Sequence, residues 1–351
     1  MLTLTTHDTK RGEDARARID ALSEIAPEWR AALMRWRRFN DAKKSLVDGE
    51  LAPDRNDEYL FYQTLVGAWP GGSLDGAEFA GFRERIAAYM QKAIKEAKVH
   101  TSWVNPNEAY DRAVEKFVRE VLAPENSDSF LNDFSQFQQG LAFAGMLNSL
   151  SQTLLKMTSP GLPDFYQGTE LWDLNLVDPD NRRPVDFAKR RILLEELKRG
   201  EETDLGRLLC DLLSHWQDGR VKLYLIYKTL NFRGEHEELF QRGRYLPLYA
   251  ARKFRENICA FGRRLDGRWV IAVAPRLLAR IVPPGRLPLG QLVWEDAILP
   301  LPYGAPDYWH NILTGEILSA CETNRKQKGL PLHQIFKSYP VALIESGRTM
   351  R

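Results

Sequence analysis

The sequence contains few cysteines, and this narrows the classes of protein to which it can belong. Only three occur among its 351 residues, at Cys210, Cys259 and Cys321. They stand too far apart to form the paired framework of a small secreted domain or the closely spaced ligand set of a zinc site. We therefore expect three buried free thiols in a reducing compartment, and we expect neither a metal nor a cofactor.

Long hydrophobic runs are absent as well. No stretch reaches eighteen consecutive apolar residues, and the N-terminus lacks the cationic start and apolar run of a targeting signal. The sequence therefore predicts a cytoplasmic protein that has no membrane partner.

The charges balance, so a strong excess of one sign is also missing. Lys and Arg number 49 against 47 Asp and Glu, which gives a formal net charge of +2. Proteins that bind nucleic acid through its phosphates usually carry a clear basic excess, so we do not expect a nucleic-acid partner. What the sequence does have is 44% hydrophobic residues in a long chain, enough to bury a substantial core.

Two segments combine a short apolar strand with a polar loop and a following helix. In the first, residues 2–5 alternate apolar and β-branched side chains and run into a polar loop at His7. In the second, Leu162–Gln167 is followed by the charged loop Asp178–Asp186. A strand, a loop rich in ionisable residues and a helix form the half-unit from which the active sites of (β/α)8 barrels are built. If both strands belong to one parallel barrel, their loops open on the same face.

The pattern changes near residue 243. Before it, helical spacing predominates, and Phe130–Leu155 is the longest apolar helix. After it, short alternating runs separated by Gly and Pro predict strands, with a hairpin at Asp266-Gly267. The expected strands are Ile258–Arg264, Trp269–Ala274, Leu289–Trp294, Tyr308–Leu313 and Val341–Glu345. We therefore expect residues 243–351 to form a small antiparallel β domain.

Charged residues in the two loops are candidates for chemistry, although each also has an ordinary structural explanation. Asp8 of the His7-Asp8 pair could cap the next helix, and Asp14 and Arg18 would form an exposed i,i+4 pair. The charges of Asp180–Arg183 could form a surface ion-pair network of little energetic weight. No Ser/His/Asp arrangement, glycine-rich phosphate loop or metal-ligand spacing stands out. On the residues alone, these alternatives stay open.

Four segments together resemble a known family. Thr5–Asp14 (TTHDTKRGED) resembles the fourth signature region of the α-amylase superfamily, in the variant of the maltooligosyl trehalose synthases. Three later segments resemble the same family in the same order, namely Thr101–Asn107, Ser159–Glu170 and Leu176–Asp186. The first and last segments make the resemblance specific, whereas Ser159–Glu170 indicates only the superfamily. The similarity extends over nearly the whole chain and is thinner in the final β domain.

The resemblance implies an activity in trehalose biosynthesis. Enzymes of this glycoside hydrolase superfamily branch act as isomerases, converting the reducing-end α-1,4 linkage of a maltooligosaccharide into an α,α-1,1 linkage by intramolecular transglycosylation. Asp8 matches the third carboxylate of the superfamily, which follows strand seven of the TIM barrel, and His7 matches the neighbour that contacts sugar hydroxyls. By position, Lys10 would orient the released glucose. The other substrate-binding candidates are Arg11, Tyr166, Asp180 and Arg182.

One departure from the family is as informative as the matches. The similarity begins at strand seven, whereas the family's aspartate nucleophile and glutamate acid/base follow strands four and five. We therefore expect residues 1–242 to be the last two β/α units of a (β/α)8 barrel with a large helical insertion, followed by a β-sandwich at 243–351. The chain would be the C-terminal portion of a longer enzyme, inactive without a missing N-terminal catalytic segment. The alternatives are another superfamily enzyme of the trehalohydrolase type and a non-catalytic carbohydrate-binding fragment.

Overall fold

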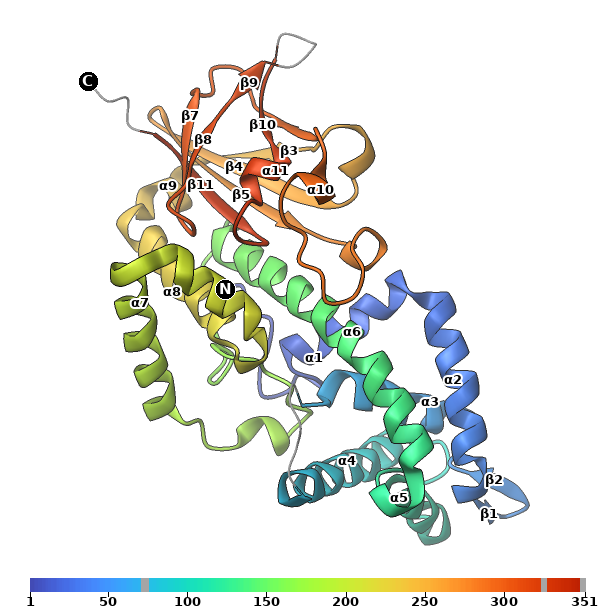
Figure 1. The fold of residues 1–351 in the computed structure, drawn as a ribbon. Helices are drawn as coiled ribbons and strands as arrows, with labels where there is room; N and C mark the ends of the chain where they lie inside the picture. The colour runs from blue at the N-terminus through green and yellow to red at the C-terminus, as the bar shows by residue number, and fades with distance from the viewer. Residues whose placement is uncertain (71–75, 323–326, 348–351) are drawn as a thin grey trace. The chain divides into compact units, whose positions relative to one another are not determined.

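The computed structural model describes residues 1–70, 76–322 and 327–347 (Figure 1). Its contacts divide the chain into two units. The helical unit consists of His7–Gly145 and Leu174–Arg183. The sheet unit consists of Met1–Thr6, Met146–Asp173 and Pro184–Arg351. Each unit is described by itself.

Helices joined by short connections make up the helical unit. They are α1 (Glu13–Ala21), α2 (Ala26–Asn40), α3 (Arg55–Ala68), α4 (Gly76–Ala97), α5 (Glu108–Val121) and the first part of α6 (Pro124–Thr158). A small hairpin of β1 (Ser45–Val47) and β2 (Glu50–Ala52) connects α2 to α3. The helix predicted at Phe130–Leu155 lies within α6, as expected from its apolar spacing.

Aromatic side chains form the centre of this unit. Trp36 of α2 is fully buried, and its ring centroid lies 5.4 Å from that of Tyr62. The rings of Phe130 and Phe134 lie 5.9 and 5.2 Å from it. Each of these side chains removes a large apolar area from water, so the cluster fixes α2 and α3 against the first part of α6.

The sheet unit contains two antiparallel sheets and the remaining helices. Six strands follow the order β3-β4-β5-β11-β7-β8, and three follow the order β6-β10-β9. The strands of the larger sheet are β3 (Arg244–Leu248), β4 (Ile258–Leu265), β5 (Arg268–Pro275), β7 (Tyr308–Asn311), β8 (Ile317–Ser319) and β11 (Ala342–Ser346). Those of the smaller sheet are β6 (Ile298–Pro300), β9 (Cys321–Glu322) and β10 (Lys328–Pro331). The helices are α7 (Phe187–Ser214), α8 (Arg220–Glu235), α9 (Glu237–Arg242), α10 (Gln291–Trp294) and α11 (Leu332–Ile335).

Antiparallel structure after residue 243 is confirmed. The predicted hairpin joins β4 to β5, with Leu265 opposite Arg268. Asp266 and Gly267 adopt φ angles of 47° and 80°, the left-handed values of a tight turn whose twist matches that of the strands. The finer description of these sheets as a sandwich stays a prediction. The expected boundary at residue 243 falls within the sheet unit, where α9 gives way to β3.

One predicted strand is wrong. Residues 291–294, within the expected strand Leu289–Trp294, form the short helix α10 after Gly290, whose φ is 69°. Trp294 is fully buried, with its ring centroid 5.2 Å from Phe254 and 4.9 Å from Phe336. The apolar side chains therefore pack from one helical turn. The hydrophobic pattern of only four residues does not distinguish such a turn from a strand.

The two expected barrel strands lie side by side, but only one residue of each is paired. Leu2 and Pro163 form a parallel bridge. The Leu2 N–H donates to the Leu162 oxygen at 2.8 Å, and the Asp164 N–H donates to the Leu2 oxygen at 2.9 Å. An isolated parallel pair is marginal without further strands, and no other strand pairs with either segment among the described residues. The parallel direction agrees with two β/α units, and the barrel itself stays a prediction.

Two predictions about which side chains are buried were also wrong. Cys210 is exposed, and Cys259 and Cys321 are half-buried, so the cysteines are free but not fully buried. Asp14 and Arg18 are buried at 3% and 4% exposure rather than exposed, because their helix α1 packs inside the unit. The Arg18 guanidinium donates to the Trp69 backbone oxygen, which satisfies part of the buried cation.

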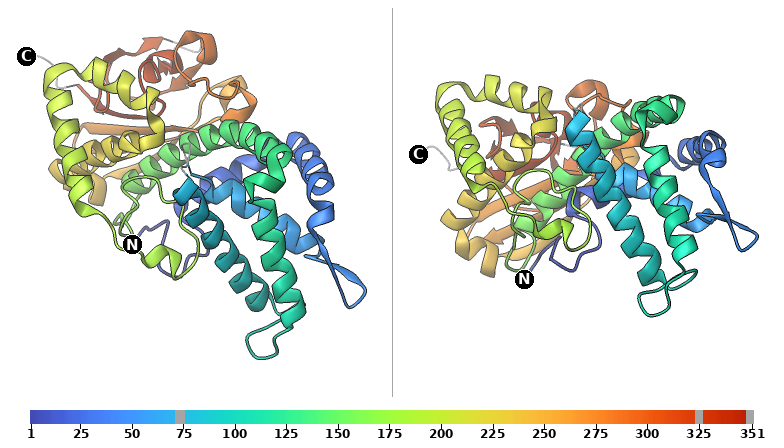
Figure 2. Two further views of the ribbon diagram at one scale, coloured as in Figure 1. Left: turned by 60° about the horizontal axis from the view of Figure 1, so that its bottom comes forward. Right: turned by 90° about the horizontal axis from the view of Figure 1, so that it is seen from below.

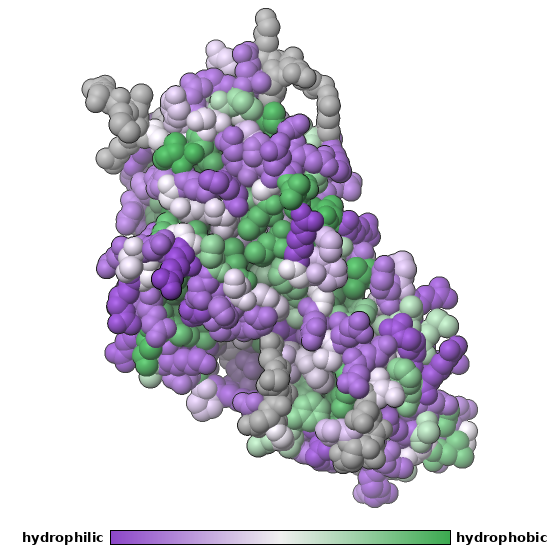
Figure 3. Space-filling view, in the orientation of Figure 1, coloured by the Kyte–Doolittle hydropathy of each residue, from purple (hydrophilic) through white to green (hydrophobic). Residues whose placement is uncertain are grey.

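One face of the molecule is largely polar (Figure 3). Figure 3 shows hydrophilic side chains over much of one face, with smaller apolar patches among them. Among the described residues, no helix has the length and apolar character needed to cross a membrane.

Candidate functional site

The first predicted loop meets residues 174–183 within the helical unit, and these residues include Asp178–Arg183 of the second predicted loop; the rest of that loop, Pro184–Asp186, belongs to the sheet unit. We name residues 7–12 loop A and residues 174–183 loop B. Arg11 and Leu176 form an antiparallel bridge, and the Gly12 N–H donates to the Asn175 oxygen at 2.7 Å. The Asn181 side-chain amide donates to the His7 backbone oxygen at 2.8 Å. Loop A therefore lies against loop B, as expected for loops that follow neighbouring strands.

His7 and Asp8 form the most accessible polar pair of loop A. His7 Nε2 lies 3.2 Å from Asp8 Oδ2, and the two side chains are 52% and 83% exposed. A carboxylate accepts hydrogen bonds at both oxygens, and imidazole adds a donor or acceptor. This combination suits a ligand that is rich in hydroxyl groups.

Lys10 contacts helix α4 through an ion pair. Its Nζ donates to Glu96 Oε2 at 2.7 Å. This hydrogen bond raises the pKa of Lys10 and lowers the pKa of Glu96, so both groups stay charged at neutral pH. Lys10 is therefore a permanent cation beside Asp8, partly engaged by Glu96.

The Arg11 side chain is directed to the helices. Its guanidinium donates to Thr64 Oγ1 of α3 at 3.3 Å and lies 5.7 Å from the centroid of the Tyr89 ring of α4. Its backbone oxygen accepts a hydrogen bond from Arg16 at 2.7 Å. These contacts fix the end of loop A, and a contact between Arg11 and substrate stays a prediction.

Asp180 is a buried anchor of loop B. It is 8% exposed, and its Oδ2 accepts hydrogen bonds from the Leu176 N–H and from Arg85 Nε, both at 2.8 Å. Its Oδ1 is paired with Arg183. The Asp180–Arg183 charges are thus not merely a surface network, since this carboxylate organises the loop and ties it to α4.

Arg182, by contrast, faces solvent. Its Nε lies 2.6 Å from Asp178 Oδ1, and the two side chains are 53% and 41% exposed. An exposed pair of this kind is worth little for stability, so its guanidinium is accessible to a ligand.

Six of the seven predicted residues thus belong to the helical unit, and Tyr166 belongs to the sheet unit. Tyr166 is half-buried, and its backbone oxygen accepts hydrogen bonds from the Thr169 N–H at 3.1 Å and hydroxyl at 2.8 Å.

Charged side chains of α4 that the sequence analysis did not select support the site. Arg85, Lys92 and Glu96 lie at i, i+7 and i+11, which places them on one helical face. Lys92 Nζ donates to the Asp178 backbone oxygen at 2.6 Å, Arg85 anchors Asp180, and Glu96 binds Lys10. Their helical spacing was the available signal. Arg85 and Lys92 also line a cavity of about 300 Å³ together with Leu176–Asp180.

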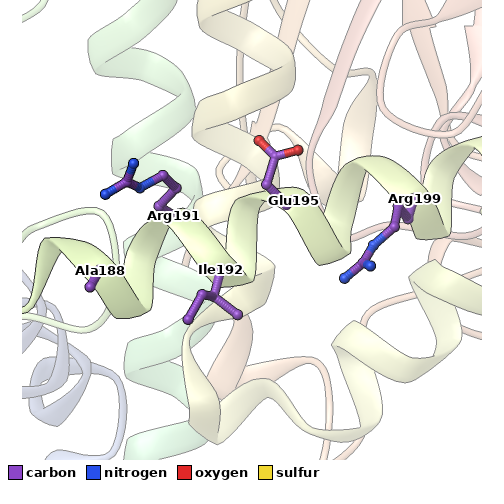
Figure 4. Close-up of a pocket in the computed structure, with 5 residues that line it drawn as sticks. All are labelled: Ala188, Arg191, Ile192, Glu195 and Arg199. Carbon is purple, nitrogen blue, oxygen red and sulfur yellow. The ribbon is translucent and has the colours of Figure 1, made fainter.

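A hollow in the sheet unit has a different character. Figure 4 shows its lining residues, all of which project from helix α7. They are Ala188, Arg191, Ile192, Glu195 and Arg199. A single helix face presents no converging polar groups, so we place no site there.

Among the described residues, one group could hold a metal, with ligand atoms within 4.8 Å of one another: Asp54, Asp57 and His100. Each of these residues already has protein partners. His100 Nε2 lies 3.0 Å from Asp54 Oδ2, and Tyr110 donates to Asp57 Oδ2 at 2.5 Å. Asp54 Oδ1 also caps α3 by accepting two backbone hydrogen bonds. This network joins α3 to the loop before α5, and we base no metal chemistry on it.

Known proteins resemble the chain in sequence. No family model matches it. It is 33% identical over 344 residues to a curated protein of Mycobacterium tuberculosis strain H37Rv that carries the name maltooligosyl trehalose synthase. The alignment covers 98% of this chain and 37% of that relative.

Solved structures of proteins with this name also resemble the chain. The maltooligosyltrehalose synthase from Arthrobacter ramosus matches with a TM-score of 0.75 and 32% identity, over 98% of this chain and 38% of that chain. A hypothetical maltooligosyl trehalose synthase of Sulfolobus tokodaii matches with a TM-score of 0.67 and 28% identity, over the same shares. The chain therefore spans well under half the length of each of these relatives.

Proposed function

We propose that the chain is the C-terminal part of a maltooligosyl trehalose synthase, because it is similar to proteins of that name along 98% of its length. The proposed reaction is the conversion of the reducing-end α-1,4 linkage of a maltooligosaccharide into an α,α-1,1 linkage, an intramolecular transglycosylation. The polypeptide that completes the active site is a segment outside these 351 residues. The observation that carries the proposal is the contact of loop A with loop B, which gathers His7, Asp8, Lys10 and Arg182 into one unit.

Asp8 acts on the transition state in this proposal. A retaining mechanism needs a carboxylate nucleophile and a carboxylic acid about 5 Å apart across the scissile bond, and Asp8 takes neither role. Its carboxylate holds hydroxyls of the distorted ring and stabilises the positive charge that develops as the bond breaks. His7 contributes a further hydrogen bond to the same ring.

Lys10 controls the fate of the released glucose. Transfer rather than hydrolysis requires that the anomeric hydroxyl of this glucose attack the intermediate before water does. A permanently charged ammonium, positioned by Glu96 at 2.7 Å, can hold the glucose hydroxyls in one orientation. Arg11 follows it in loop A, and the exposed Arg182 of loop B completes the proposed sugar-binding set on the helical unit, with Asp180 holding loop B in place. A sugar contact of Tyr166, which belongs to the sheet unit, stays a separate prediction.

The test is product analysis after joining the chain to the polypeptide encoded immediately upstream. The joined protein is expected to convert maltopentaose into a non-reducing saccharide of the same mass. Asp8→Asn is expected to lower kcat by about 100-fold or more, because a charge that stabilises the transition state is lost. The matched control is Asp41→Asn, an exposed carboxylate after α2, which is expected to retain full activity.

Other products would contradict the proposal. Free trehalose as the main product would indicate a hydrolase, and full activity of the Asp8→Asn variant would remove Asp8 from the mechanism.

A further inference from the structure

We propose that Trp103 is a stacking platform for a glucosyl ring of the maltooligosaccharide, extending the sugar-binding surface beyond loops A and B. The substrate class of this inference rests on the proposed function. The observations that assign the role to Trp103 are its exposure, the ordered loop that carries it, and the connection of that loop to the candidate site.

Trp103 differs from the other tryptophans. It is 62% exposed, whereas the remaining eight, all within the described part of the chain, are buried or half-buried. Leaving an indole in water forgoes the favourable free energy that burial of its large apolar area would give. Tryptophan combines a large flat apolar face with a polar N–H, and a pyranose ring offers apolar C–H groups to such a face.

An ordered loop displays this side chain. Residues 98–107 join α4 to α5 at the end of these two helices (Figure 2). The Ser102 N–H donates to the Asn105 oxygen at 3.1 Å, and the Asn105 N–H donates to the Ser102 hydroxyl at 2.9 Å. The Asn107 N–H donates to Thr101 Oγ1 at 3.0 Å, and the Asn107 side chain caps α5. A loop ordered before binding loses little conformational entropy when a ligand arrives.

His100 secures the base of the loop. Its ring stacks on Tyr110 with centroids 4.4 Å apart and an interplanar angle of 25°, and its Nε2 lies 3.0 Å from Asp54 Oδ2. The loop is therefore fixed to both α5 and the start of α3.

One cation orients the indole. Lys95 Nζ lies 4.8 Å from the centroid of the Trp103 ring, within the range of a cation–π contact, and 3.3 Å from Asp111 Oδ2. Lys95 occupies one face of the ring, and the side chain still keeps most of its surface in water. The opposite face is the one we assign to the sugar.

Helix α4 connects this platform to the candidate site. Lys95 precedes Glu96, which binds Lys10 of loop A at 2.7 Å, and Lys92 binds the backbone of Asp178 in loop B at 2.6 Å. The last turns of α4 thus touch loop A, loop B and Trp103. An oligomeric substrate that places its reacting ring at Asp8 has further rings, and these can extend along α4.

The experiment is calorimetric titration of the 351-residue chain with maltoheptaose. Trp103→Ala is expected to raise Kd by about tenfold, because the stacking surface is removed, and Trp103→Phe is expected to restore part of the affinity. The matched control is Val104→Ala, which removes a side chain that is 95% exposed on the same loop and should leave Kd unchanged. Circular dichroism is expected to show all three variants folded.

Each contrary result has a distinct meaning. Binding by the parent chain that Trp103→Ala leaves unchanged would overturn the role of Trp103 while leaving the proposed function intact. No binding by the parent chain would overturn the sugar-binding surface as a whole, Trp103 included. An equal loss in Val104→Ala would show that any change in this loop weakens binding, and would overturn the assignment of stacking to the Trp103 ring.

Discussion

At the scale of single residues, close packing between α1 and α6 explains why residue 145 is a glycine. A Cβ at Gly145 would lie 2.4 Å from Arg18 Cγ and 2.9 Å from Arg18 Cα. Gly145→Ala is therefore expected to lower the free energy of unfolding by about 1–3 kcal/mol, measured by urea denaturation. Gly81 of α4, where a Cβ would meet nothing within 4 Å, is the control, and Gly81→Ala should raise stability by about 0.4–1 kcal/mol. Equal effects at the two sites would contradict the packing argument.

The Asp133 carboxylate makes a pH-dependent contribution to the free energy of unfolding. Burial opposes its ionisation, but hydrogen bonds from Arg35 and Trp36 outweigh this and lower the pKa of Asp133 below 3.8. The stabilisation is therefore complete above pH 3.8 and is lost as the pH falls through the lowered value.

Asp133→Asn is expected to cost about 1–2 kcal/mol at pH 7, because Trp36 Nε1 donates to Asp133 Oδ1 at 2.6 Å and Arg35 binds both oxygens. Urea denaturation at pH 7 and below pH 3 measures the difference. If the variant is destabilised as much below pH 3 as at pH 7, the lost charge of Asp133 is not the cause of the destabilisation.

At the scale of elements, loop B depends on a buried ion pair with α4. The side chains of Arg85 and Asp180 are only 14% and 8% exposed. Asp180→Ala is expected to cost about 3–5 kcal/mol in unfolding free energy, because it leaves Arg85 buried without its counter-charge. Arg182→Ala, on the same loop, should cost no more than about 1 kcal/mol. Thermal denaturation compares them, and a similar small effect of both would mean that loop B does not need this anchor.

Elements with repeated local patterns were predictable from sequence. The Asp266-Gly267 turn and the spacing of α6 follow from conformational preferences that need no distant partner. The helix α10 and the burial of Asp14 and Arg18 were not predictable, because packing against residues far along the chain decides them.

The candidate site shows the same division. His7, Asp8 and Lys10 were selected from a motif, whereas their support comes from far along the chain. Glu96 binds Lys10 from 86 residues away, and Arg85 and Lys92 bind loop B from 95 and 86 residues away. No local pattern in the sequence states which face of α4 meets loops A and B.

At the scale of the whole molecule, catalysis is expected to need more than these residues. In the proposed mechanism, two carboxylates besides Asp8 carry the covalent chemistry. The 351-residue chain alone is therefore expected to give no detectable conversion of maltopentaose, assayed by chromatography of the products. Turnover by the isolated chain would require a nucleophile within it and would contradict the proposed division of the active site.

The two units also interlace along the polypeptide. The chain passes from one unit to the other between residues 6 and 7, 145 and 146, 173 and 174, and 183 and 184. No single cut separates them, and neither can be encoded as one uninterrupted stretch of gene. Recombination that crosses over anywhere between residues 7 and 183 would therefore divide both units at once, so an exchange that keeps the helical unit whole has to inherit that entire stretch as one block.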